Sequence, residues 1–201
     1  MFIWTSDLGG VRAIARRTLL GLGVMALAGC LAAPVEKKPQ AMAAVAFHEG
    51  AVVVTGPRGY CVDAASVRRG ASGSFALMAS CASLGQTGGV YADPAVMTVS
   101  VLPRAASAQV PDAQAMARAL APAKVRVAQE QDGLEVVQVM QGGDAVLPGG
   151  DPVHWRAGMI VNGHLVGLAV YGPAGQGVAG RDGEALLRAM ARAIRAASPS
   201  S

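Results

Sequence analysis

The chain has 201 residues, with 17 Lys and Arg against 13 Asp and Glu and a formal net charge of +4. Hydrophobic residues make up 52% of it and aromatic residues only 4%. Its basic residues form short pairs such as Lys37-Lys38 and Arg68-Arg69. Since no basic stripe is interleaved with aromatic residues, nucleic acid is not an expected partner.

The N-terminal segment has the charge pattern of an export signal. The first 17 residues carry three arginines against one acid, Asp7, and the next twelve, Thr18 to Gly29, are uncharged. A basic segment followed by an apolar run of roughly 7–15 residues is typical of a secretory signal peptide. The run is too short for a stable membrane span, which takes about 20 apolar residues. We therefore expect residues 1–29 to be a signal peptide.

The apolar run ends in Leu27-Ala28-Gly29-Cys30. This motif resembles the lipobox of bacterial lipoproteins, and it lies directly after the apolar run, where that family requires it. The resemblance covers about the first thirty residues and implies cleavage after Gly29 and a diacylglycerol on the Cys30 thiol. It also implies acylation of the new amino group, which matters because a single chain anchors only marginally. The alternatives are an ordinary signal with a chance cysteine and a mis-assigned start codon.

The residues around the motif bear on the export route and the target membrane. Residues 16–20, Arg-Arg-Thr-Leu-Leu, loosely resemble a twin-arginine signal but lack its full consensus, so we favour general secretion. In Gram-negative lipoproteins an Asp after the cysteine commonly signals inner-membrane retention, and here Leu31 follows. For a Gram-negative host this favours the periplasmic face of the outer membrane. The membrane, through lipid on Cys30, is the first expected partner.

Cleavage after Gly29 would leave 172 residues, which carry 14 basic and 12 acidic side chains, so the net charge falls to +2. That length is enough for one domain with a substantial core. Residues 31–46 mix Ala, Pro and charges without a turn-bounded pattern. We therefore predict a lipidated Cys30 and a flexible tether over residues 30–46, followed by one domain over residues 47–201.

Two cysteines, Cys61 and Cys81, follow Cys30. Disulfides persist in exported proteins, and an even pair there indicates one bridge. The alternatives are a metal ligand or a catalytic thiol. Metal sites usually show closely spaced Cys or His ligands, so no metal site is expected here. The three histidines are scattered along the sequence: His48, His154 and His164.

Short apolar segments separated by turn residues indicate a β-rich domain. Strands are predicted at residues 51–55, 60–63, 74–80, 96–102, 124–129 and 134–141. Residues 66–73 are predicted to be a loop, and Asp132-Gly133 a hairpin turn. A first helix is expected from Pro111-Asp112 to about Leu120, where Pro122 stops it.

The clearest element is the segment 153–171, in which Asn162-Gly163 separates two apolar runs. This dipeptide is preferred in type I′ hairpin turns. The turn fixes the register, so Val161 should face His164 at the rim. Further pairs are expected between Met159 and Val166, Ala157 and Leu168, and Trp155 and Val170. One face is assigned to the core, with Trp155, Met159, Val166, Leu168 and Val170, and His154 is placed on the other face.

A second helix is predicted from about Arg181 to Ala196, with an apolar stripe of Leu186, Leu187, Met190 and Ile194. Six or seven short strands with two helices, joined by hairpins, indicate an α+β fold with a mostly antiparallel sheet. The C-terminal helix should pack on the face that carries Trp155. The order of elements loosely resembles PsbP-like domains, a likeness of fold that implies nothing about function.

Residues 175–180, Gly-Gln-Gly-Val-Ala-Gly, match the G-x-G-x-x-G pattern of dinucleotide-binding proteins. A Rossmann unit also needs a second parallel strand and an acidic residue about 20 positions on. Here the preceding strand belongs to a hairpin, and the sequence reaches Ser201 where that second strand should lie. We interpret the glycines as a flexible connection and expect no nucleotide and no other cofactor.

Signals of catalysis are weak. The sequence has no G-x-S-x-G elbow, and a Cys81–His pair would be abolished by a disulfide. Asp144 and Asp151 are interpreted as parts of a solvated loop, although carboxylates paired in space are invisible in a sequence. Tyr60 and Tyr171, each beside a Gly-Pro turn, are interpreted as closing the ends of the core. No catalytic residue is therefore predicted.

Together these patterns predict a membrane-anchored envelope lipoprotein whose domain is a non-catalytic binding or assembly module. Its partner would be an envelope protein or a cell-wall component. Two alternatives stay open. One is a periplasmic enzyme, either a hydrolase or a thiol-dependent catalyst using Cys81. The other is a small-ligand carrier with an apolar cavity between the sheet and the terminal helix.

Overall fold

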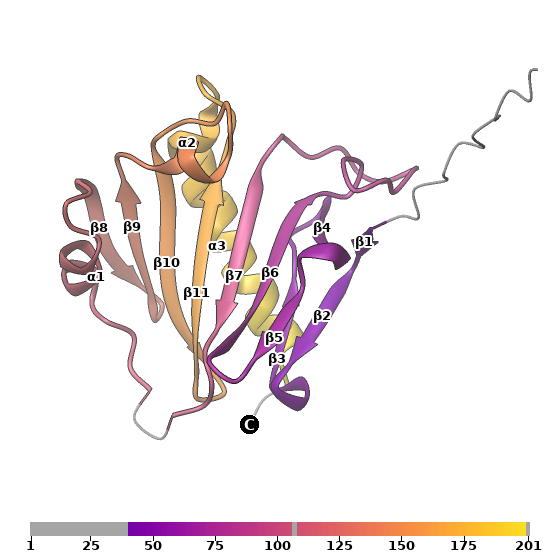
Figure 1. The fold of residues 1–201 in the computed structure, drawn as a ribbon, viewed down its shortest axis with the longest axis horizontal. Coiled ribbons are helices and arrows are strands. Elements are labelled where there is room, and N and C mark those ends of the chain that lie inside the picture. Colours follow the sequence, from indigo (N-terminus) through magenta and orange to yellow (C-terminus); the bar gives the residue numbers. More distant parts are fainter. Residues whose placement is uncertain (1–39, 106–107, 200–201) are drawn as a thin grey trace, which may run out of the picture. The chain divides into compact units, whose positions relative to one another are not determined.

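The structure, a computed structural model, describes residues 40–105 and 108–199. The predicted signal peptide, Cys30 and most of the predicted tether lie outside these residues. A nine-stranded antiparallel sheet forms the centre of the described domain (Figure 1). Its order is β1-β4-β6-β7-β11-β10-β9-β8, with β5 paired to β6 alone, and a separate two-stranded sheet joins β2 and β3.

The eleven strands of the described residues are short. They are β1 (Ala41–Met42), β2 (Ala44–Phe47), β3 (Val52–Thr55), β4 (Tyr60–Asp63), β5 (Arg68–Gly70), β6 (Gly73–Ser80), β7 (Val96–Val101), β8 (Val125–Gln131), β9 (Leu134–Val139), β10 (His154–Val161) and β11 (His164–Tyr171). The α-helices are α1 (Ala113–Ala119), α2 (Gly143–Val146) and α3 (Arg181–Ala197). Short 3-10 helices lie at His48–Gly50, Ala64–Ser66 and Gly177–Ala179. The predicted α+β class is confirmed.

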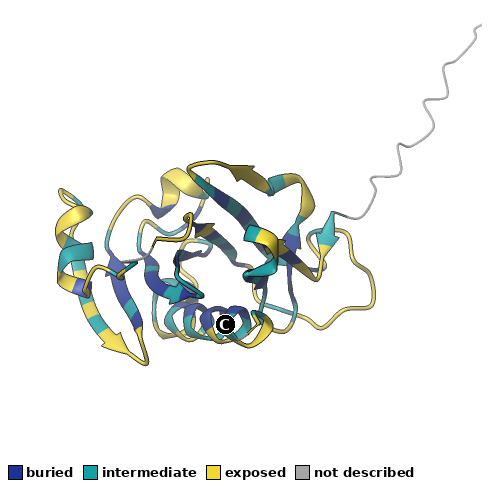
Figure 2. Ribbon diagram, turned by 90° about the horizontal axis from the view of Figure 1, so that it is seen from below, coloured by how far each residue is buried: buried dark blue, intermediate teal, exposed yellow. Residues whose placement is uncertain are grey.

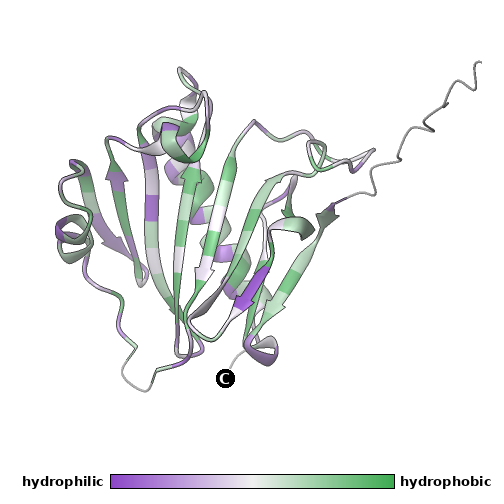
Figure 3. Ribbon diagram, viewed as in Figure 1, coloured by the Kyte–Doolittle hydropathy of each residue, from purple (hydrophilic) through white to green (hydrophobic). Residues whose placement is uncertain are grey.

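Helix α3 packs on one face of the sheet and closes the main core (Figure 2). Its side chains Leu187, Met190 and Ile194 are fully buried, while Leu186 is half-buried. Burying one such side chain contributes roughly 1.5–3 kcal/mol. Figure 3 shows hydrophobic residues along most strands, β11 and β2 among them, whereas β5 is hydrophilic. Within the described residues, no helix is both long and apolar enough to cross a membrane.

The predicted hairpin of β10 and β11 is confirmed in register. Val161 pairs with His164, Met159 with Val166, and the pairing continues to Trp155 with Val170. Asn162 and Gly163 take φ values of 49° and 78°, as a type I′ turn requires. All five residues assigned to the core face are buried, at most 3% exposed. The C-terminal helix packs on this face, as predicted, and the Trp155 indole Nε1 donates a 2.8 Å hydrogen bond to the Gly180 carbonyl.

The N-terminal part of the domain differs from the prediction. Residues 41–46, assigned to the tether, instead form β1 and most of β2, and Val45 is only 5% exposed. The segment is rich in alanine, which has little preference for strands, so the pairing of β1 with β4 and of β2 with β3 decides the outcome. The predicted loop 66–73 also contains β5, which forms a hairpin with β6. The one-turn helix α2 was not predicted.

The predicted disulfide is present between Cys61 on β4 and Cys81, the residue after β6. The two strands are neighbours, and Cys61 pairs with Ala79. The bond therefore joins adjacent strands at one end of the sheet. A thiol-dependent mechanism at Cys81 would require this bond to open first.

Candidate functional site

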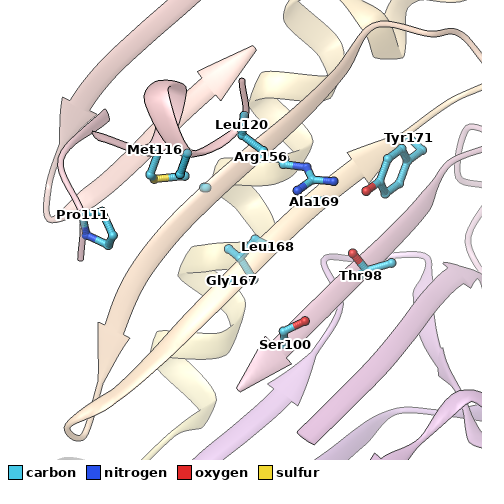
Figure 4. Close-up of a pocket in the computed structure, with 12 residues that line it drawn as sticks. Thr98, Ser100, Pro111, Met116, Leu120, Arg156, Gly167, Leu168, Ala169 and Tyr171 are labelled. Carbon is cyan, nitrogen blue, oxygen red and sulfur yellow. The ribbon is translucent and has the colours of Figure 1, made fainter. Parts of the chain in front are cut away.

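The face of the sheet opposite α3 is only partly covered. Helix α1 packs over β8 and β9, and beside it lies a groove of about 380 Å³ (Figure 4). The floor comes from β7, β10 and β11, and one wall comes from α1 and the segment before it. The lining residues include Thr98, Ser100, Pro111, Met116, Ala119, Leu120, Arg156, Gly167, Ala169 and Tyr171.

Two glycines shape this groove. A Cβ added to Gly167 on β11 would have only Ser100 Cβ within reach, at 4.0 Å, so the space above Gly167 is open. A Cβ at Gly158 on β10 would meet Val110 Cγ1 at 2.8 Å. Gly158 thus lets the segment before α1 lie close on the sheet. Gly167 supplies the depth of the groove.

The α1 wall is fixed to the sheet by hydrogen bonds and packing. The Asp112 side chain caps the helix by accepting from the Ala115 N–H, and Glu135 on β9 accepts from the Ala113 N–H at 2.9 Å. Met116 and Leu120 pack against a small cluster that includes buried Val137 and Val139. The predicted first helix is therefore present and presents Met116 and Leu120 to the groove.

Arg156 on β10 is the charged residue of the groove. The strand register places Thr98 opposite Ala169 and Ala169 opposite Arg156, so the hydroxyl and the guanidinium flank a small residue. Figure 4 shows the guanidinium of Arg156 and the hydroxyl of Tyr171 pointing toward one another above Ala169. Within the described residues, the single ion pair within 4.0 Å joins Arg188 and Glu184. Arg156 therefore has no carboxylate partner there.

His154 orients Arg156 from below. The Arg156 Nε donates to His154 Nε2 at 3.1 Å, and His154 Nδ1 lies 3.3 Å from the Pro152 carbonyl. A neutral imidazole that accepts at Nε2 carries its proton on Nδ1, which can donate to Pro152. The ring is 3% exposed and stacks on Tyr171 at 4.9 Å. Burial lowers the His154 pKa below 6.5, and the Arg156 charge lowers it further against the Pro152 carbonyl, which raises it.

The other two histidines meet at a different place. His48, expected near the tether, stacks on His164 with ring centroids 4.3 Å apart. His164 lies beside the hairpin turn as predicted, and its Nδ1 is 2.8 Å from the Leu102 carbonyl. The Nε2 of His48 is buried with no hydrogen-bond partner in the described part of the chain. Neither ring lies in the groove.

The remaining candidates divide between structural roles and the groove. Tyr60 closes one end of the core as predicted, with its hydroxyl donating to the Asp93 carbonyl at 2.7 Å. Burial, followed by the charges of Asp93 and Tyr91, raises the Tyr60 pKa. Tyr171, also interpreted as closing the core, instead lines the groove. Asp144 is exposed on α2, and Asp151 accepts from the Val153 N–H at 2.9 Å.

The glycine-rich segment 175–180 lies in an antiparallel context. The preceding strand β11 pairs antiparallel with both β7 and β10, which is not the geometry of a dinucleotide site. The segment is also held by the core. Gln138 Nε2 donates to the Ala179 carbonyl at 2.6 Å, and Trp155 holds the next carbonyl. The segment connects β11 to α3, as predicted. Unlike the flexible connection expected from its glycines, it is held by hydrogen bonds to two of its carbonyls.

Sequence reasoning missed Arg156, Thr98 and Ser100. The sequence did contain a signal. Arg156 interrupts an apolar strand, and in β7 the polar residues Thr98 and Ser100 alternate with buried apolar residues, which places both of them on the same face. Across residues 40–105 and 108–199, no three His, Cys, Asp or Glu side chains are arranged to hold a metal ion. Comparisons of the chain with models of protein families, with curated proteins and with solved structures find no match.

Proposed function

We propose that this protein is an exported envelope lipoprotein, anchored through lipid on Cys30, whose domain is a non-catalytic binding module. Its ligand site is the groove on the open face of the sheet. The observation that carries the proposal is Arg156, a half-buried guanidinium without a carboxylate partner among the described residues. The lipobox motif supports the anchor.

The chemistry of the groove favours a carboxylate ligand that carries a short apolar group. Guanidinium binds carboxylates through two parallel hydrogen bonds, and His154 already orients the Arg156 side chain. The hydroxyls of Thr98 and Tyr171 lie beside it, while Met116 and Leu120 offer apolar contact. A volume of about 380 Å³ falls in the range of small-molecule sites, roughly 300–1,000 Å³.

The chemistry of the described residues favours binding without catalysis. The Nε2 lone pair of His154 accepts from Arg156, so it is not free to take a proton from a substrate. Cys81 is held in the disulfide. The carrier alternative placed a cavity between the sheet and the terminal helix, but that space is occupied by the buried side chains Trp155, Leu187 and Met190. The groove lies on the other face.

Calorimetric titration of the purified mature protein tests the site. Octanoate represents a free acid, and N-acetyl-alanyl-alanine represents the carboxylate end of a cell-wall or protein peptide. We expect one of them to bind the wild type. Because the guanidinium is lost, Arg156→Gln should weaken binding by at least about tenfold, the equivalent of 1.4 kcal/mol. Gly167→Val should abolish it by filling the open space, and valine suits a strand.

Arg192→Gln is the matched control, since it removes the same charge from an exposed position on α3. It should bind the probe as the wild type does. Thermal unfolding should show that all three variants are folded. Equal affinity in Arg156→Gln and Arg192→Gln, or no binding of either probe by the wild type, would refute the proposed site.

The anchor is tested separately by incorporation of radiolabelled palmitate into growing cells that express the full chain. The wild type should be labelled and Cys30→Ala should not, because the thiol is the proposed acceptor. Equal labelling of the two proteins would rule out lipidation at Cys30.

A further inference from the structure

The described chain begins at one end of the sheet and is fixed there. The Gln40 N–H donates to the Leu84 carbonyl at 3.2 Å, and the Gln40 carbonyl accepts from the Ala64 N–H at 2.8 Å. Leu84 belongs to the loop over residues 81–95 that connects β6 to β7 (Figure 1). A chain arriving from the N-terminus therefore reaches the domain beside this loop.

This loop exposes two apolar side chains. Tyr91 is 82% exposed and Val90 is 45% exposed. The loop is nevertheless held in place at both ends, because the Gln86 N–H donates to the Cys81 carbonyl at 3.0 Å and Asp93 accepts from the Tyr60 hydroxyl. Tyr91 is thus exposed on a loop whose conformation is fixed by hydrogen bonds.

Further exposed apolar and basic residues lie at the same end. Val146 on α2 is 48% exposed, and its neighbour Leu147 lines a hollow together with Pro94 and Ala95 of the loop. Arg58 is exposed in the turn before β4, beside Gly59, whose backbone lies against Val90. Val90, Tyr91, Val146 and Arg58 together are called the N-terminal end patch.

We propose that the N-terminal end patch rests on the bilayer surface to which the protein is anchored. This rests on the proposed lipidation of Cys30. Nine residues lie between Cys30 and Gln40, and the ten steps from one Cα to the next span at most about 33–36 Å when fully extended. The patch is therefore kept within a short distance of the lipid, where the anchor raises its local concentration and a weak contact is populated.

The chemistry of the patch fits a membrane interface. Tyrosine has an apolar ring and a polar hydroxyl and is enriched at the level of the lipid headgroups. Valine contributes apolar area beside it, and the Arg58 guanidinium can reach lipid phosphates. Asp93 in the same loop is exposed and charged, so the contact is shallow.

Tryptophan fluorescence of the lipidated protein tests this orientation. The protein is reconstituted in phosphatidylethanolamine–phosphatidylglycerol vesicles with brominated acyl chains, which quench nearby indoles. Trp155 is 3% exposed and supplies a constant background, and Trp4 belongs to the predicted signal. Tyr91→Trp introduces the probe in the patch. Leu102→Trp is the matched control, since Leu102 is 43% exposed at the opposite end of β7.

We expect the added emission of Tyr91→Trp to fall by about twofold in brominated vesicles, since interfacial side chains sit at the headgroup boundary. The emission of Leu102→Trp should stay unchanged. If both variants float with the vesicles and show equal quenching, or none, the orientation is wrong while the anchor stands. If wild-type protein does not float with the vesicles, both the anchor and this orientation are overturned.

Discussion

His154 and Arg156 fix each other's orientation, and Arg156 favours the neutral form of the His154 ring. The neutral ring accepts from the Arg156 Nε, and the guanidinium in turn opposes protonation of the ring. Stacking on Tyr171 fixes the plane of the ring. The polar end of the groove is therefore fixed in advance, which would reduce the entropy lost on binding the proposed ligand.

This pair makes the stability of the fold depend on pH. The unfolded chain binds a proton at His154 with an ordinary pKa near 6.5, whereas the folded chain binds it only at lower pH. Acid therefore favours the unfolded state, and the free energy of unfolding should fall as the pH drops below about 6.5. One proton contributes at most about 1.4 kcal/mol per pH unit. Urea unfolding at several pH values measures it.

His154→Gln is the comparison that isolates this residue, because His48 and His164 remain. The variant should lose part of the acid sensitivity, and its unfolding free energy should change less between pH 7.5 and 5.5. An unchanged pH dependence in His154→Gln would show that other groups account for it.

Among the elements, the β10–β11 hairpin has a role beyond its own two strands. The Asn162 Nδ2 donates to the Ala51 carbonyl at 2.8 Å and to the Pro199 carbonyl at 2.7 Å. A turn residue chosen for its φ of 49° thus also joins three distant parts of the chain. Asn suits both tasks, since it tolerates the left-handed region and carries two side-chain N–H groups.

Two substitutions separate the tasks of Asn162. Asn162→Gly keeps the backbone conformation but loses both hydrogen bonds, so it should cost about 1–2 kcal/mol of unfolding free energy. Asn162→Ala also strains the backbone and should cost about 1 kcal/mol more. Chemical denaturation gives both values. Equal costs would mean that the left-handed conformation contributes nothing measurable.

The disulfide ties β4 to the end of β6 across a separation of 20 residues. Closing a loop of this length constrains the unfolded chain and contributes about 3 kcal/mol. Replacing Cys61 and Cys81 together with alanine should lower the Tm by about 6–12 °C. Calorimetry with and without reductant is the measurement. Reductant should lower the Tm of the wild type and leave the Tm of the variant unchanged. If the wild type has the same Tm with and without reductant, this prediction is wrong.

The elements that could be predicted from the sequence are those with local signals. Asn162-Gly163 fixed a register that the structure reproduces pair by pair, and Asp112 marked the start of α1. Strands β1 and β2 were missed because alanine-rich segments become strands only through their partners. The groove was missed for the same reason: Arg156, Thr98 and Gly167 meet only once three strands are aligned.

At the scale of the whole domain, the two faces of the sheet differ. The face under α3 is filled by buried side chains, while the other keeps an open groove beside α1. The filled face carries the large hydrophobic cluster and supplies most of the hydrophobic stabilisation, whereas the open face adds only the small cluster under α1. Most of the hydrophobic core is therefore remote from the groove.

A substitution that creates a cavity under α3 should measure how much the filled face contributes to the free energy of unfolding. Met190→Ala removes a fully buried side chain and should lower the free energy of unfolding by about 2–5 kcal/mol. Arg192→Ala, two positions on and exposed, should change it by less than about 0.5 kcal/mol. Urea denaturation measures both changes in the free energy of unfolding. Similar values for the two variants would mean that α3 is not tightly packed on the sheet.

Helix α3 follows every strand in chain order, and this has a consequence for biogenesis. While the ribosome is still adding these residues, the sheet has nothing to cover Trp155, Met159 and Val166, so the domain cannot close. The proposed N-terminal export signal emerges long before that point. The nascent polypeptide thus completes its core only after nearly all of the domain has been synthesised, so the proposed signal would be available for export while the domain is still loosely folded.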